Sequence, residues 1–68
     1  MVQPITSRQL SILQFINAHP GVARDQLLRL PQVTDQDVRY LEDNDLIRER
    51  EAGRCRVTHL GETVLRRA

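Results

Sequence analysis

The chain of 68 residues contains no lysine and no tryptophan, and it has only one cysteine. That residue, Cys55, cannot close an internal disulfide, and two histidines supply no metal-ligand framework. No apolar run approaches the roughly 20 residues of a membrane-spanning helix. The N-terminus has no basic segment followed by an apolar stretch, which argues against a secretory signal. We therefore expect a cytoplasmic protein with no metal, no cofactor and no membrane partner.

The chain is also short, which leaves little interior to enclose a substrate. A chain of this length forms one small domain, which buries only about 60% of the surface that it exposes when unfolded. It has no glycine-rich phosphate loop, no nucleophile at a recognisable spacing from a base, and no converging pair of carboxylates. We expect one domain over residues 1–68, with loose ends at 1–4 and 65–68. We expect neither an enzyme nor a small-molecule substrate.

The first helix is predicted from its cap and its apolar pattern. Thr6 followed by Gln9 fits a capping box, and Pro20 with the glycine after it ends the helix. Its apolar residues cover an arc of roughly 220°, which is wider than one core face requires. They are Leu10, Ile12, Leu13, Phe15 and Ile16. We therefore expect Ile12 and Phe15 to form a protein interface, for a homodimer or another partner.

Two further helices are expected before residue 45. Val22 suits a short extended piece, and a helix over about 24–30 follows it and stops at Pro31. Thr34 and Asp37, three residues apart, fit an acidic capping box that opens the third helix. Asn44 is expected to end that helix in the left-handed conformation.

The last third of the chain predicts a hairpin and a short helix. Segments 46–51 and 54–58 flank Ala52-Gly53, which suits a two-residue turn. That turn predicts cross-strand pairs of opposite charge, Glu51 with Arg54 and Glu49 with Arg56. Thr58 then caps the final helix, and Cys55 is expected to be a small buried hydrophobe.

Two segments carry a family resemblance. In residues 38–47, Leu-Glu is followed by a turn and then by Leu-Ile, and in residues 56–61 a strand leads into a Thr-x-x-Gly helix start. At this spacing, with one short wing between them, they resemble the winged helix-turn-helix family of prokaryotic transcription regulators, of the MarR and PadR kinds. The resemblance covers about residues 6–65. It implies a mainly α fold with a small β-hairpin: three helices, a wing and a short C-terminal helix.

The same resemblance implies that the third helix lies in the major groove of double-stranded DNA. The helical period places four residues on its outward face, namely Gln36, Arg39, Tyr40 and Asp43. Arg39 suits guanine and Gln36 suits adenine. The wing carries Arg48, Arg50, Arg54 and Arg56, and arginine suits phosphates and a narrow minor groove. The expected function is a sequence-specific DNA-binding regulator from a prokaryote or a bacteriophage.

The charge distribution leaves a second hypothesis open. Residues 35–45 hold one arginine against five carboxylates, although the whole chain has a net charge of +1. Because DNA repels carboxylates, an acidic third helix favours a winged-helix protein-interaction module, which would also use the apolar face of the first helix. The overall charge argues against a mimic of DNA. No ligand spacing supports a metal site at His19, His59 and Cys55.

Overall fold

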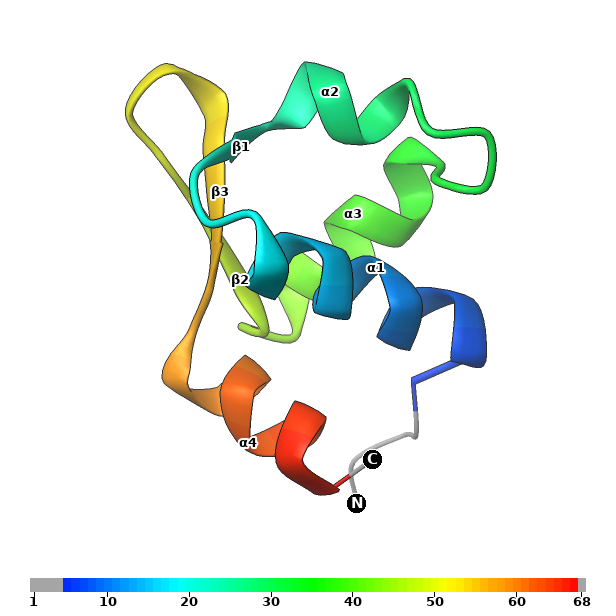
Figure 1. Ribbon diagram of the computed structural model, residues 1–68, viewed down its shortest axis with the longest axis vertical. Coiled ribbons are helices and arrows are strands. Elements are labelled where there is room, and N and C mark those ends of the chain that lie inside the picture. Colours follow the sequence, from blue (N-terminus) through cyan, green and yellow to red (C-terminus); the bar gives the residue numbers. More distant parts are fainter. Residues whose placement is uncertain (1–4, 68) are drawn as a thin grey trace.

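The computed structural model describes residues 5–67, so the expected tail at 1–4 lies outside the described residues. The elements are α1 (Ser7–Ala18), β1 (Val22–Ala23), α2 (Arg24–Leu28), α3 (Asp35–Asp43), β2 (Ile47–Arg50), η1 (Glu51–Gly53), β3 (Arg54–Val57) and α4 (His59–Arg67). This is a mainly helical chain with a small antiparallel sheet, arranged as expected for a winged helix-turn-helix (Figure 1).

The helix starts confirm the expected caps. Thr6 Oγ1 accepts from the Gln9 amide at 3.0 Å, and Gln9 Oε1 accepts from the Thr6 amide at 3.1 Å. Thr34 and Asp37 make the same reciprocal pair of bonds at 3.2 and 3.4 Å. Each pair satisfies two amides that the helix itself leaves unbonded. Helix α2 is shorter than expected, because after Leu28 the amides bond to carbonyls three residues back, which tightens the turn.

The register of the hairpin differs from the expected one. Residues Glu51–Gly53 form one turn of 3₁₀ helix, and Gly53 adopts φ 70°. With three residues in the loop, β2 and β3 pair Arg50 with Arg54 and Arg48 with Arg56. The expected pairing of Glu51 with Arg54 and Glu49 with Arg56 is therefore wrong. Because the loop holds one more residue than expected, arginine lies opposite arginine at both positions where a glutamate was expected to face an arginine.

The core lies between the sheet and the helices. Strand β3 is central, between β1 and β2, and α1 packs against β3, α3 and α4 (Figure 1). The buried apolar residues are Ile12, Leu13, Ile16, Val22, Leu27, Val38, Leu41, Leu46, Ile47 and Cys55. The broad apolar arc of α1 is largely used inside the chain, because this helix meets three other elements. The prediction that Cys55 is buried is confirmed.

The turn after α3 corrects a second prediction. Asp45 adopts φ 59°, whereas Asn44 stays at φ −91°. The Asn44 side chain donates to the Tyr40 carbonyl at 2.7 Å, and its amide donates there at 3.1 Å, so Asn44 closes the last helical turn. The Asp45 amide bonds to Glu42 O, and the next amide bonds to Leu41 O, each at 2.9 Å. These are the two bonds of a Schellman ending, which places the left-handed residue at Asp45.

The start of helix α4 is hydrogen-bonded to this turn. Thr58 Oγ1 donates to the Asp45 carbonyl and accepts from the Gly61 amide at 3.0 Å, which confirms Thr58 as the cap. A Cβ on Gly61 would overlap the Leu46 carbonyl oxygen, so this position needs glycine. The helix continues to Arg67, so residues 65–67 are helical where a loose end was expected.

Candidate nucleic-acid interface

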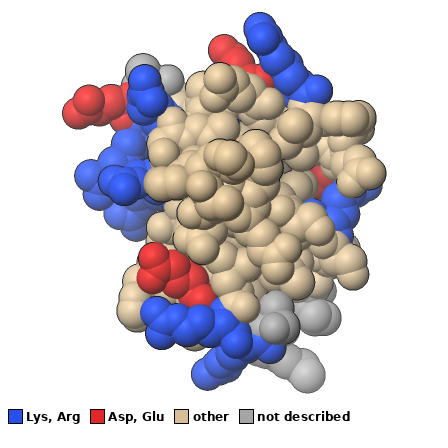
Figure 2. Space-filling view, in the orientation of Figure 1, with Lys and Arg blue, Asp and Glu red and all other residues tan. Residues whose placement is uncertain are grey.

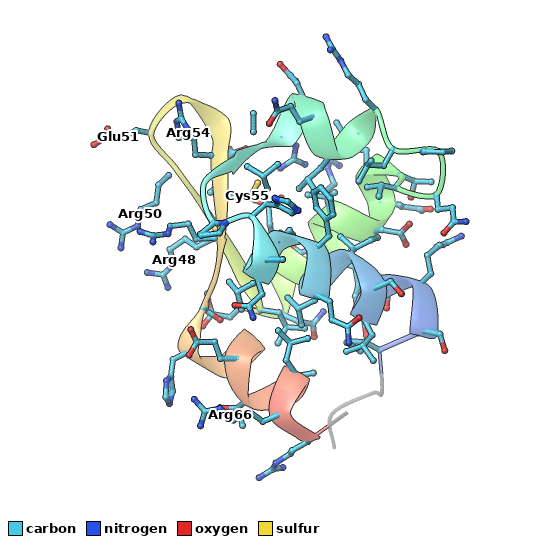
Figure 3. The ribbon with its side chains drawn as sticks, in the orientation of Figure 1. Arg48, Arg50, Glu51, Arg54, Cys55 and Arg66 are labelled. Carbon is cyan, nitrogen blue, oxygen red and sulfur yellow. The ribbon has the colours of Figure 1, made fainter. Side chains whose placement is uncertain are left out.

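Four exposed arginines share the outer face of the hairpin. Along β2 and β3 the buried Ile47 and Cys55 point into the core, and the residues that alternate with them point outward. We call this outer side the arginine face, and it consists of Arg48, Arg50, Arg54 and Arg56. Figure 2 shows a group of basic side chains over the hairpin. In Figure 3, Arg48 and Arg50 extend away from the ribbon while Cys55 points inward.

The arginine face concentrates positive charge that the chain itself neutralises little. Arg48 lies opposite Arg56, and Arg50 lies opposite Arg54. Like charges at directly opposed positions destabilise a hairpin. Within residues 5–67 the face has one ion pair, from Arg48 Nη2 to Asp45 Oδ1 at 3.4 Å, and both side chains are mostly exposed. Such a pair is screened by salt and contributes little. The face is therefore suited to an anionic ligand with several charges.

The arginine face continues into a shallow hollow at the start of α4. Arg48, Arg50 and Arg56 line it together with Asp45, His59 and Leu60. Leu60 is 47% exposed, although it is a large apolar residue. Arg54 lies outside this hollow, and its Nη1 donates to the Gly21 carbonyl at 3.3 Å. Arg50 and Arg56 are therefore the two arginines of the face that make no side-chain hydrogen bond or ion pair with the described residues.

The outward face of α3 carries the residues expected to read bases. Gln36, Arg39 and Asp43 are exposed, and Tyr40 is half-buried. The Arg39 side chain is 72% exposed, and its Nε lies 3.1 Å from Asp35 Oδ2. An exposed pair with this i, i+4 spacing stabilises a helix by only about 0.3–0.5 kcal/mol. A stronger acceptor can therefore draw Arg39 away from Asp35.

Arg24 pairs with three carboxylates, a cluster that the sequence did not reveal. Its Nη1 lies 2.6 Å from Glu42 Oε1 and 3.6 Å from Glu49 Oε1, and its Nη2 lies 3.0 Å from Asp35 Oδ1. The bonds to Glu42 and Asp35 raise the pKa of Arg24 above its ordinary value, although burial acts against them. The cluster joins α2, α3 and β2, and it places one guanidinium beside three carboxylates.

A second arginine compensates the buried acid of α3. Asp37 is 4% exposed, and its Oδ1 lies 3.1 Å from Arg8 Nη2. Burial alone would raise the pKa of Asp37, but hydrogen bonds from Thr34 and Arg8 together lower it below its ordinary value. Asp37 is therefore a charged cap and takes no part in the outward face. Among residues 5–67, Asp43 is the acid of this helix that has no arginine partner.

The two residues expected to form a protein interface differ in how far they are buried. Ile12 is 4% exposed and belongs to the core, so it offers little surface to a partner, at the floor of a hollow beside Leu30 and Val33. Phe15 is half-buried, and its ring lies 4.5 Å from the ring of His19.

Burial, followed by the charges of Glu49 and Glu42, raises the pKa of the Cys55 thiol. The described residues contain no group of three metal-ligating side chains.

Comparisons of the chain with protein families, with curated proteins and with solved structures find no match. No helix in the described part of the chain has both the length and the apolar character needed to cross a membrane.

Proposed function

We propose that this protein is a double-stranded DNA-binding regulator of prokaryotic or phage origin, which acts in the cytoplasm without catalysing a reaction. The observation that carries the proposal is the arginine face, where Arg48 opposes Arg56 and Arg50 opposes Arg54. A chain that only had to fold would gain stability from opposite charges at these positions. A DNA backbone supplies the missing negative charges, and their neutralisation releases counterions.

The two parts of the surface have different tasks in this proposal. Phosphate contacts from the arginine face give affinity and fix the position of the protein on the duplex. Arg39 and Gln36 of α3 read base edges in the major groove, where Arg suits guanine and Gln suits adenine. The acids of α3 permit this approach because three of them, Asp35, Asp37 and Glu42, are paired with Arg24 or Arg8.

A titration of labelled duplex with matched variants tests the proposal. The double variant Arg50→Gln/Arg56→Gln removes two charges from the arginine face, whereas Arg29→Gln/Arg67→Gln removes two exposed charges elsewhere. Fluorescence anisotropy with a random-sequence duplex should show a loss of at least about tenfold for the first variant and little change for the second. Equal losses would mean that net charge alone governs binding, and no binding by the native protein would refute the proposal.

The alternative is a protein-interaction module that uses α1 and the acidic third helix. The burial of Ile12 and the internal pairing of Asp35, Asp37 and Glu42 weaken this alternative. It predicts that Phe15→Glu abolishes partner binding and leaves duplex binding unchanged.

A further inference from the structure

Arg24 and Arg39 share one carboxylate. Asp35 Oδ1 lies 3.0 Å from Arg24 Nη2, and Asp35 Oδ2 lies 3.1 Å from Arg39 Nε. The two arginines differ in their surroundings. The Arg24 side chain is 23% exposed and has two further acidic partners, whereas the Arg39 side chain is 72% exposed and has Asp35 as its ion-pair partner in the described chain.

Of the two arginines, Arg39 is therefore the one that can move away from Asp35. When Arg39 turns to a base edge, Asp35 keeps the cation of Arg24, so Asp35 is not left uncompensated. Arg24 itself stays in place, because Glu42 from α3 and Glu49 from β2 hold it from other elements. We propose that Arg24 is a positioning residue that makes Arg39 available for base recognition. This inference rests on the proposed DNA-binding function.

Removal of Arg24 should therefore reduce sequence discrimination without any loss of a direct DNA contact. In Arg24→Gln, Arg39 becomes the remaining cation for Asp35 among the described residues, and their pairing strengthens. Leaving Asp35 for a base would then expose an unpaired carboxylate to the DNA. The ratio of affinities for a specific and a random duplex should fall, because that ratio depends on Arg39.

The experiment begins with the native protein and a randomised duplex library, from which it selects a preferred sequence. Anisotropy then gives the ratio of affinities for the selected duplex and a scrambled duplex. We expect Arg24→Gln to lower this ratio about tenfold, as expected for one lost base contact. The double variant Arg24→Gln/Asp35→Asn should restore the ratio to within about threefold of the native value, because Asn no longer holds Arg39 by charge.

The matched control is Arg8→Gln, which removes the arginine from the other ion pair on α3. It should lower thermal stability and leave the ratio unchanged. An unchanged ratio in Arg24→Gln, or no recovery in the double variant, would overturn the inference while the proposed function survives. If no duplex is selected by the native protein, both are wrong.

If circular dichroism shows that Arg24→Gln does not fold, the ratio of affinities is measured for the single variant Asp35→Asn instead. Because Arg39 then has no carboxylate to leave, we expect the ratio to rise about threefold. A fall in the ratio would overturn the inference.

Discussion

Arg48 on β2 lies directly opposite Arg56 on β3, on the outer face of the sheet. This pair predicts that function and stability change in opposite directions when one charge is removed. Arg56→Gln should raise the free energy of unfolding by about 0.3 kcal/mol at low salt, because it relieves a like-charge pair. It should also weaken duplex binding and reduce the slope of log affinity against log salt by about one.

Arg29→Gln is the control for this prediction, since Arg29 is an exposed arginine at the end of α2. Urea unfolding and anisotropy measure the two effects. A lower stability of Arg56→Gln together with an unchanged salt slope would show that Arg56 has a packing role instead.

Arg39→Ala should affect the choice of sequence more than affinity in general. Because Arg39 is exposed on α3 and only weakly held by Asp35, its removal should cost little stability. The free-energy difference between a selected and a random duplex should shrink by about 1–3 kcal/mol. Anisotropy with both duplexes measures this difference. Equal losses on the two would contradict a base-reading role for Arg39.

Asp37 predicts a specific dependence of stability on pH. Its pKa in the folded chain is lower than its ordinary value of 3.8, so its contribution to stability is fully present at neutral pH. That contribution is lost as the pH falls through the folded pKa. Asp37→Asn should therefore lower the free energy of unfolding by about 2 kcal/mol at neutral pH, and the difference from native should shrink as the pH falls below the ordinary carboxyl range. Urea unfolding across this range checks it, and a constant difference would contradict the charged cap.

The sign of the stability change in Gly61→Ala tests how closely α4 packs against the turn after α3. In an exposed helix, Gly→Ala stabilises by up to about 1 kcal/mol. Here an added Cβ would overlap the Leu46 carbonyl oxygen, where α4 crosses the turn after α3. Gly61→Ala should therefore destabilise the chain by about 1–3 kcal/mol in urea unfolding. A stabilised variant would show that α4 does not pack as described.

Local signals in the sequence predicted most of the fold. The capping boxes at Thr6 and Thr34 were correct because each depends on two side chains three residues apart. The hairpin was correctly located, but its register depends on whether the loop holds two or three residues. Ala52-Gly53 does not specify that number, because glycine suits both loop lengths, and in the structure Gly53 takes the left-handed position that ends a three-residue loop.

The candidate site was less predictable than the fold. The outward arginines were identified, but their mutual opposition followed only from the true register. The cluster at Arg24 joins residues 24, 35, 42 and 49, which belong to three different elements. No spacing rule connects them, because tertiary packing brings them together. The same packing buries Ile12, whose helical pattern alone had suggested an interface.

The salt dependence of binding to a random-sequence duplex is the decisive test of DNA binding by the arginine face. If the four side chains of the arginine face each neutralise one phosphate, the slope of log affinity against log salt should be about −3.6. Affinity should then fall about 150-fold between about 50 and 200 mM salt. Binding that is absent at the lower concentration, or that does not change between the two, would show that the arginine face does not bind the DNA backbone.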